Sequence, residues 1–167
     1  MHIRPATSGD LPAILNILDR VIPIMHAAGN HQWGSGYPNA EVFTQDIRLG
    51  QLWVAEIDGT VGGVAAVTLD APSYFLNPDW TVDPTAAITT HRLAVDPDLG
   101  GRGIASRLMQ KAEEIARERG VSLLRADTDP KNPVTNYLFP KLGYQFVGSF
   151  GIGFRPGMRF LCYEKRL

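Results

Sequence analysis

The sequence predicts an α/β protein of mixed α+β type, with a single mixed, mostly antiparallel sheet of about six or seven strands flanked by helices. Strand-like and helix-like segments alternate along the chain, and two pairs of strands follow one another through short connections, which requires antiparallel pairing. The 167 residues suit one hydrophobic core. No repeat or linker interrupts them, so we expect one domain over residues 1–167.

The first third of the chain predicts a strand and two helices. "HIRPA" has the character of a short strand. Ser8 or Asp10 is placed to cap the following helix, which Pro23 should bend or end. Asn39 is placed to cap a second helix over about residues 40–49.

The middle of the chain predicts a hairpin, a loop and a third strand. "QLWVAEIDGTVGGVAAVTL" indicates two strands joined at Asp58-Gly59, a residue pair that favours a tight hairpin turn. Residues 70–86 combine prolines with aromatic residues and predict a long loop. "AAITTHRLAV" then predicts a strand.

The last third predicts two helices and three strands. A helix over Gly103–Arg119 should end at Gly120, and its apolar face is formed by Ile104, Leu108, Ala112, Ile115 and Ala116. "VSLLRADT" is apolar enough for an inner strand. A short helix over Pro133–Leu142 leads to two closing strands, "YQFVGSF" and "MRFLCYEK".

Composition limits the function classes. The net charge of −1 provides no general field for nucleic acid or an anionic membrane, so we expect neither as a partner. No apolar run is long enough to span a membrane and the start lacks a signal-peptide pattern. The single cysteine, Cys162, excludes an internal disulfide, and its strand-like surroundings favour a packing role. We therefore expect a cytoplasmic protein without a metal site.

The stretch "VDPDLGGRGIASRLM" predicts an anion site. Gly100, Gly101 and Gly103 stand where a strand turns into a helix, and Arg102 adds a charge. The first N–H groups of a helix lack partners and lie at the positive end of its dipole. A tight turn without a ligand is the alternative. The P-loop and dinucleotide-binding patterns both fit poorly.

The same residues carry a family resemblance. "HRLAVDPDLGGRGIASRLMQKAEEIARERG" resembles the acetyl-CoA-binding strand, turn and helix of the GNAT N-acetyltransferases. Their motif is [RQ]-x-x-G-x-[GA]; Gly103 and Ala105 match it, whereas Gly100 replaces the Arg or Gln. The departure affects a side chain and leaves the main-chain amides in place.

A second block supports this resemblance, which extends over nearly the whole chain. "NPVTNYLFPKLGYQFVG" is similar to the GNAT pattern N-x-x-A-x-x-L-[YF]-x-x-x-G-[FY]. Asn132, Leu138, Phe139, Gly143 and Tyr144 are in register, and Thr135 takes the alanine position. The opening "IRPATSGDLPAIL" also resembles the GNAT start. The resemblance implies a GNAT-like fold and an acyltransferase that uses acetyl-CoA.

The resemblance also implies a cofactor site. The strand from His91 to Val95 should diverge from "VSLLRADT", so that the pantetheine arm of coenzyme A binds main-chain groups of Leu93, Ala94 and Val95. The diphosphate should rest on the N–H groups of Gly100, Gly101, Arg102, Gly103, Ile104, Ala105 and Ser106. Asn132 should offer its amide to pantetheine, unless it serves only the local turn, and Phe139 should lie near the thioester sulfur.

The reaction implied is direct attack of an amine on the thioester. At pH 7 only about one part in 2,500 of an amine with a pKa of about 10.4 is neutral, equivalent to about 4.6 kcal/mol. His91 is the candidate base, because "HRLAV" resembles "HALAV" in arylalkylamine N-acetyltransferases; a structural histidine is the alternative. Phe139 stands where many GNAT enzymes have an acid tyrosine, which leaves Tyr137 as a weak substitute.

The acceptor is predicted to be a small primary amine, or the N-terminus or lysine of a peptide or protein. Aromatic and histidine residues in two turn-rich segments are candidates to bind it, although they are equally suited to covering the core: His31, Trp33, Tyr37 and Tyr74.

Two other function classes compete with this interpretation. A non-catalytic acyl-CoA-binding sensor on the same fold would explain the absent acid tyrosine, and a dinucleotide-binding oxidoreductase would need the poorly matched glycine pattern. The closing strands are compatible with pairing between two copies in a homodimer.

Overall fold

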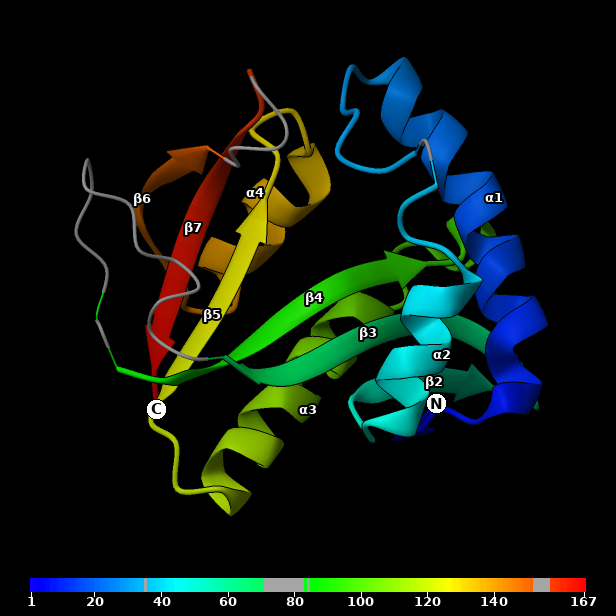
Figure 1. The fold of residues 1–167 in the computed structure, drawn as a ribbon, viewed down its shortest axis with the longest axis horizontal. Coiled ribbons are helices and arrows are strands. Elements are labelled where there is room, and N and C mark those ends of the chain that lie inside the picture. The colour runs from blue at the N-terminus through cyan, green and yellow to red at the C-terminus, as the bar shows by residue number, and fades with distance from the viewer. Residues whose placement is uncertain (35, 71–82, 84, 152–156) are drawn as a thin grey trace. The chain divides into compact units, whose positions relative to one another are not determined.

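The structure is a computed structural model that describes the chain except for residues 35, 71–82, 84 and 152–156 (Figure 1). Most of the loop predicted over residues 70–86 therefore lies outside the described residues. The element order agrees with the one predicted from the sequence.

The described strands form one seven-stranded sheet in the order β1-β2-β3-β4-β5-β7-β6. Their bounds are His2–Pro5 for β1, Leu52–Ile57 for β2, Thr60–Asp70 for β3, Ala87–Val95 for β4, Leu123–Thr128 for β5, Gln145–Gly151 for β6 and Arg159–Arg166 for β7. The β1–β2, β2–β3, β5–β7 and β6–β7 pairs are antiparallel, whereas β4 and β5 are parallel. The prediction of a mixed, mostly antiparallel sheet is confirmed.

Four α-helices and two single 3-10 turns complete the described elements. The helices are α1 over Leu11–Ala27, α2 over Ala40–Arg48, α3 over Ile104–Glu118 and α4 over Pro133–Lys141, and the turns are Ser8–Asp10 and Pro97–Leu99. All five residues predicted for the apolar face of α3 are buried.

The chain divides into two compact units. Unit 1 comprises Met1–Val67 and His91–Lys111, and unit 2 comprises Thr68–Thr90 and Ala112–Leu167. Strands β3 and β4 and helix α3 each contribute residues to both units. The single domain expected from the sequence stays a prediction.

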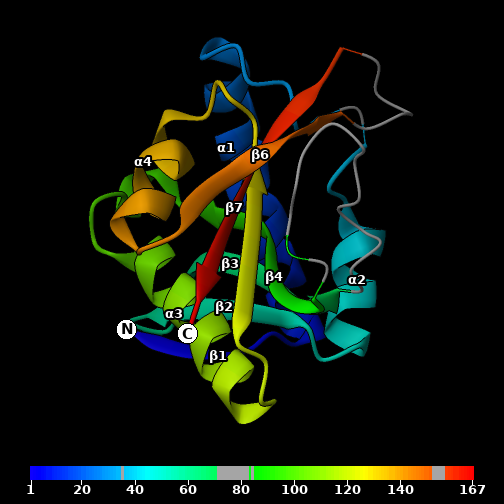
Figure 2. The same ribbon diagram turned by 90° about the vertical axis from the view of Figure 1, so that its left-hand side faces the viewer.

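Unit 1 has helices on both sides of its strands. In Figures 1 and 2, α1 and α2 lie on one side of β2 and β3, and the start of α3 lies on the other. The first side is filled by a cluster that includes Ile14, Phe43 and Val64, and the second by one that includes Ile104 and Leu108. The second cluster includes Leu99 and Ile104 and so holds the turn before α3 against the sheet.

Unit 2 contains α4 beside its strands (Figure 2). The hydroxyls of Thr128 on β5 and Thr135 on α4 are 2.5 Å apart. Cys162 is fully buried on β7 against Val147 and Phe150. Burial raises the pKa of this thiol, and the position agrees with the packing role predicted for it.

Turn and cap chemistry follow the sequence closely at two sites. The Asn39 side chain accepts from Val42 N at 3.0 Å, as expected for the cap of α2. Asp58 and Gly59 have φ angles of 51° and 78°, which fit the predicted hairpin turn.

The start and the end of α1 differ from the prediction. The helix does not end at Pro23 but continues to Ala27, and the bend expected there as the alternative stays a prediction. Asp10 does not cap the helix with its side chain; its carboxylate accepts from Thr7 N at 2.7 Å and binds the Arg4 guanidinium at 2.8 Å. The nearby arginine competes successfully for the carboxylate.

Candidate active site

The turn between β4 and α3 requires glycine because of its backbone angles. Gly101 and Gly103 have φ angles of 77° and 76°, in the left-handed region that disfavours a Cβ. A Cβ added at either position would meet no described atom within 4 Å, so crowding by the protein is not the reason. Gly100 has an ordinary φ of −54°, and its N–H donates to Pro97 O at 3.4 Å.

The N–H groups of residues 101–106 face no acceptor of the protein. They donate no hydrogen bond to any residue that the structure describes, and the first backbone bond beyond them runs from Arg107 N to Gly103 O at 3.0 Å. Gly101, Arg102 and Gly103 are exposed. Unpartnered amides at the start of a helix, with one cation among them, form a suitable cradle for an anion.

Main-chain and charged contacts hold the entry to this cradle. Asp96 N donates to Gly62 O at 2.9 Å, and Leu99 N donates to Asp96 O at 2.9 Å. The Asp96 carboxylate accepts from Asp98 N at 2.9 Å. Arg20 on α1 binds Asp96 at 3.0 Å and Asp98 at 2.5 Å, so one guanidinium offsets part of the negative charge of two carboxylates beside the anion cradle.

Two glycines of β3 allow the turn and α3 to approach the sheet. A Cβ at Gly62 would lie 2.8 Å from Leu99 Cδ1. A Cβ at Gly63 would lie 2.7 Å from Ile104 Cγ2 and 3.1 Å from Ala94 O. Both distances to carbon are shorter than packed side chains tolerate, so here glycine is required for space.

The second half of β4 carries the predicted base and pantetheine contacts. His91 is half-buried, Ala94 is buried, and Leu93 and Val95 pack with the core beneath α3. In unit 2 the parallel pairing of β4 with β5 comprises Ile88–Thr90. The divergence of the following residues from β5 stays a prediction.

Arg92, directly after His91, forms a buried ion pair that the sequence reasoning missed. Its Nε and Nη2 donate to the two carboxylate oxygens of Asp46 on α2, both at 2.8 Å, and its Nη1 donates to Tyr37 Oη at 3.1 Å. The two charged side chains are only 13% and 7% exposed. Burial opposes the charge, but Tyr37 and Asp46 outweigh it and hold the pKa of Arg92 above its usual value.

The sequence contained one indication of this pair. Asp46 stands three positions after Phe43, which is fully buried, so both lie on the inner face of α2. A carboxylate on an apolar helix face needs a partner. The identity of that partner was not readable, because Arg92 is 46 residues away.

The predicted acceptor residues have different environments. Trp33 is 7% exposed and belongs to the core of unit 1, whereas Tyr37 joins the Arg92 pair. His31 is exposed, and its ring centroid lies 4.7 Å from that of His26, whose Nε2 is 2.6 Å from Trp33 O. Tyr74 lies outside the described residues.

In unit 2, Asn132 begins α4. Its Oδ1 accepts from Thr135 N at 3.3 Å, and its backbone oxygen accepts from Asn136 N at 3.2 Å. Pro133 follows as the first helical residue and has no N–H to satisfy. The local role left open for Asn132 is therefore present, and its predicted contact with pantetheine stays a prediction.

The two predicted aromatic residues of α4 differ in exposure. Tyr137 is 70% exposed, with Lys141 Nζ 5.6 Å from its ring centroid. Phe139 is 3% exposed, and its ring lies 5.9 Å from Tyr144 and 5.4 Å from Tyr163 between centroids. Phe139 is thus part of an aromatic cluster in unit 2. The acid role of Tyr137 and the cofactor contact of Phe139 stay predictions.

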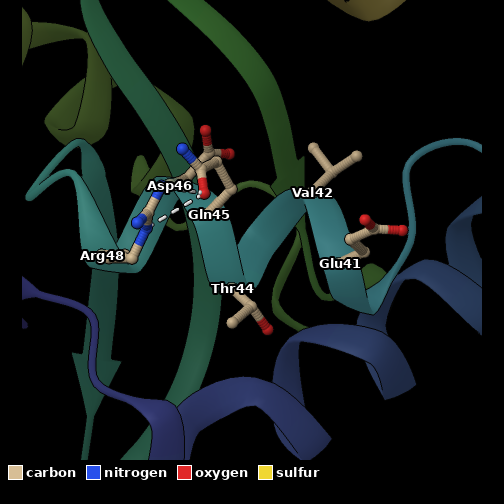
Figure 3. Close-up of a pocket in the computed structure, with 6 residues that line it drawn as sticks. All are labelled: Glu41, Val42, Thr44, Gln45, Asp46 and Arg48. Carbon is tan, nitrogen blue, oxygen red and sulfur yellow. Dashed lines mark hydrogen bonds between the residues drawn. The ribbon is translucent and has the colours of Figure 1, made fainter.

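Helix α2 also presents a shallow surface pocket (Figure 3). It is lined by Glu41, Val42, Thr44, Gln45, Asp46 and Arg48. Arg48 donates to Gln45 Oε1 at 2.8 Å, and the Thr44 hydroxyl donates to Ala40 O at 2.7 Å. The polar groups of Thr44, Gln45 and Arg48 are thus bonded within the helix, and Asp46 is bound by Arg92 on β4.

A family model decides the classification. Residues 18–144, more than half of the chain, match the acetyltransferase (GNAT) family. The chain belongs to the GNAT family. It is therefore an acyltransferase by family, as the two sequence blocks predicted.

Curated relatives and a solved structure agree with this classification. The uncharacterised N-acetyltransferase YesJ of Bacillus subtilis is 26% identical over 90% of this chain and 84% of its own length. The S-(2-succino)cysteine N-acetyltransferase of the same organism is 28% identical over 73% and 71%. A GNAT acetyltransferase from Streptococcus agalactiae 2603 is 28% identical with a TM-score of 0.83, covering 99% of this chain and 95% of that one. The predicted fold class is confirmed.

Two features are absent from the part of the chain that the structure describes. None of their helices is both long and apolar enough to span a membrane. Their His, Cys, Asp and Glu side chains form no group of three or more that is arranged to hold a metal ion.

Proposed function

We propose that this GNAT protein transfers the acetyl group of acetyl-CoA to the primary amine of a small molecule or short peptide. The observation that carries the proposal is the cradle of unpartnered amides over residues 101–106. The diphosphate of coenzyme A carries two negative charges, and main-chain N–H groups at a helix start are suited to it.

The residues of unit 1 fit this co-substrate. Gly101 and Gly103 have left-handed φ angles within the run of unpartnered amides, and Arg102 brings a positive charge. Arg20 offsets part of the negative charge of Asp96 and Asp98 and so reduces their repulsion of a diphosphate. Main-chain groups of Leu93, Ala94 and Val95 are proposed to bind the amides of pantetheine. For Asn132 and Phe139 the resemblance alone supports a role toward the cofactor.

The thioester supplies an activated acetyl group once bound; the protein must supply a neutral amine. His91 is the proposed proton acceptor, acting directly or through water. It precedes the proposed pantetheine-binding residues, so an amine next to the thioester would lie within reach of its ring. Main-chain N–H groups of β4 are suited to stabilising the developing oxyanion.

A general acid is not essential to this proposal. Phe139 has no proton to give, and Tyr137 is 70% exposed on α4. The thiolate of coenzyme A is a good leaving group, because a thiol has a pKa of about 8.5. Its departure needs little assistance.

The acceptor is proposed to be small. The relative named for S-(2-succino)cysteine acetylates a compact amino compound, which supports a small amine over a large protein surface. His31 and Tyr37 remain the proposed contacts, whereas the burial of Trp33 supports its alternative packing role.

Calorimetry with acetyl-CoA, followed by a screen of amines and short peptides for thiol release, tests the proposal. We expect saturable binding and amine-dependent release. Binding without release from any amine would favour the acyl-CoA sensor, and absence of binding to coenzyme A and its thioesters would exclude both functions. Protection from heat by NADH but not by coenzyme A would favour the oxidoreductase.

The base is tested separately with His91→Ala. We expect kcat/KM for the amine to fall at low pH and the pH profile to shift between pH values of about 6 and 9. A profile that matches the wild type would remove His91 from the mechanism and leave it as a structural histidine.

A further inference from the structure

Arg92 has a backbone conformation that its residue type disfavours. Its φ is 53°, in the middle of a strand. Among the described residues the other non-glycine with positive φ is Asp58, which belongs to a hairpin turn where that angle is normal. A left-handed residue with a long side chain costs about 1–2 kcal/mol, so the surrounding structure must hold it.

The contacts that hold Arg92 come from two other segments of unit 1. Asp46 on α2 binds the guanidinium through both carboxylate oxygens, and Tyr37 binds the remaining Nη1. A bidentate pair fixes the plane of the guanidinium as well as its distance. The network therefore determines the direction of the Arg92 side chain, and through it the local course of β4.

The position of this conformation matters for the proposed reaction. It falls between His91, the proposed base, and Leu93–Val95, the proposed pantetheine contacts. In a regular strand neighbouring side chains point to opposite faces. A left-handed residue interrupts that alternation, so it decides how the side chain before it and the peptide groups after it are oriented.

Stability alone is a poor explanation of the network. A buried ion pair gains little over well-packed apolar side chains of the same volume, because both charges must leave water. The strained backbone adds to this cost. Strained residues persist where their geometry serves a site, and here they adjoin the proposed one.

We propose that Asp46, Tyr37 and Arg92 are positioning residues that hold β4 in its left-handed turn and thereby orient His91 toward the amine. This inference rests on the proposed function. It assigns the acceptor half of the reaction to unit 1 residues distinct from the diphosphate cradle.

Two substitutions of Arg92 distinguish the effect of its backbone conformation from the effect of its side-chain contacts. Arg92→Ala loses the network and remains strained at φ 53°, so the strand should relax away from the turn. Arg92→Gly loses the same contacts but adopts the angle freely. We expect kcat for the amine to fall about 10-fold to 100-fold in Arg92→Ala, as for small misplacements of reacting groups. Arg92→Gly should retain kcat within about threefold and keep the acetyl-CoA Kd. Arg92→Ala should also weaken acetyl-CoA binding, because its relaxed strand moves the proposed pantetheine contacts at Leu93–Val95.

Asp10→Asn is the matched control. It breaks another largely buried bidentate pair of unit 1, that with Arg4, which touches no proposed site residue. Its loss of thermal stability should be similar to that of Arg92→Ala, with kcat and the amine KM unchanged. Arg92→Lys, which keeps the charge without the bidentate geometry, serves if Arg92→Ala does not fold.

A second readout does not depend on turnover. The chain has four histidines, so the ring resonances of His91 can be assigned by comparison with His91→Gln. They should shift in Arg92→Ala and Asp46→Asn, and remain near the wild type in Arg92→Gly and Asp10→Asn. Unchanged His91 resonances in Arg92→Ala, or a loss of kcat in Arg92→Gly equal to that in Arg92→Ala, would overturn the inference. A wild type that binds no acetyl-CoA would overturn the proposed function instead.

Discussion

The first turns of α3 and α4 differ in whether the chain itself pairs their free backbone N–H groups. At α4, the Asn132 side chain accepts one N–H and Pro133 removes another, so the chain satisfies its own helix start. At α3, Gly103 has no side chain to offer, and the N–H groups of Ile104, Ala105 and Ser106 bond to no described residue. One helix start is closed by its own chain and the other is left for an external anion.

Helix α2 resembles α4, because the Asn39 side chain caps it. At the entry to α1 the Asp10 carboxylate accepts from Thr7 N and caps no N–H of the helix. A side-chain cap contributes about 1 kcal/mol per helix. Because α3 lacks the cap that α2 and α4 have, the comparison supports a binding role for the start of α3.

The contrast between the helix starts of α3 and α4 is tested most directly at Gly103. Gly103→Val places a branched side chain at φ 76°, so the turn must change and the amides lose their common direction. We expect acetyl-CoA affinity to fall about 100-fold, equivalent to about 2.7 kcal/mol, measured by calorimetry. Gly120→Val is the control, because Gly120 has a similar φ of 66° at the other end of α3. Equal losses of affinity in both variants would contradict the cradle.

Acid should weaken the contacts that Asp10 makes with Arg4 and Thr7 before α1. The hydrogen bonds from Arg4, aided by Thr7 and opposed by burial, hold the pKa of Asp10 well below its usual value. The carboxylate therefore stabilises the folded state fully above a pH of about 4 and progressively less as the pH falls below it. Asp10→Asn should lower the free energy of unfolding at pH 7 by about 2 kcal/mol.

Urea unfolding at several pH values measures this effect. The difference between wild type and Asp10→Asn should shrink as the pH falls below a value of about 4. A constant difference down to a pH of about 2 would mean that the charge of Asp10 is not the stabilising feature.

Substitutions of Asn132 test whether it only caps α4 or also binds the cofactor. Asn132→Ala removes the cap and should lower stability by about 1 kcal/mol. Asn132→Asp keeps an accepting oxygen and replaces the amide nitrogen with a negatively charged oxygen, so stability should be retained while the acetyl-CoA KM rises. An unchanged KM would leave Asn132 with its cap role alone. Asn39→Ala, at the equivalent cap of α2, controls for the loss of a helix cap.

The smallest effect is expected from the charges beside the cradle. Arg20→Met leaves Asp96 and Asp98 unneutralised, which should weaken acetyl-CoA binding about threefold at low salt and less as salt screens the repulsion. Adding Asp98→Asn should restore part of the affinity. A loss that salt and the second substitution leave unchanged would indicate that Arg20 acts by shaping the turn.

Local chemistry explains which parts of the fold were predictable. The cap at Asn39, the turn at Asp58-Gly59 and the apolar face of α3 depend on residues close in sequence, and all are as predicted. The family resemblance depended on two blocks whose spacing is also visible in the sequence. The fold and the family therefore followed from local patterns.

The side-chain contacts that were not predictable form only when separate elements pack together. Asp10 is taken by Arg4, a contact that depends on how β1 meets the entry to α1. Asp46 and Arg92 are joined only after α2 packs beside β4, and the φ of Arg92 has no local sequence pattern. The site residues on the acceptor side depend on such contacts, which is why they were the weakest part of the prediction.

Gly62 and Gly63 on β3 support the proposed cofactor loop from within the sheet. Any larger residue there would press on Leu99 or Ile104 and displace the loop whose amides are proposed to grip the nucleotide tail. Random mutagenesis screened for folded but inactive protein should therefore collect substitutions in β3, at positions that no ligand touches.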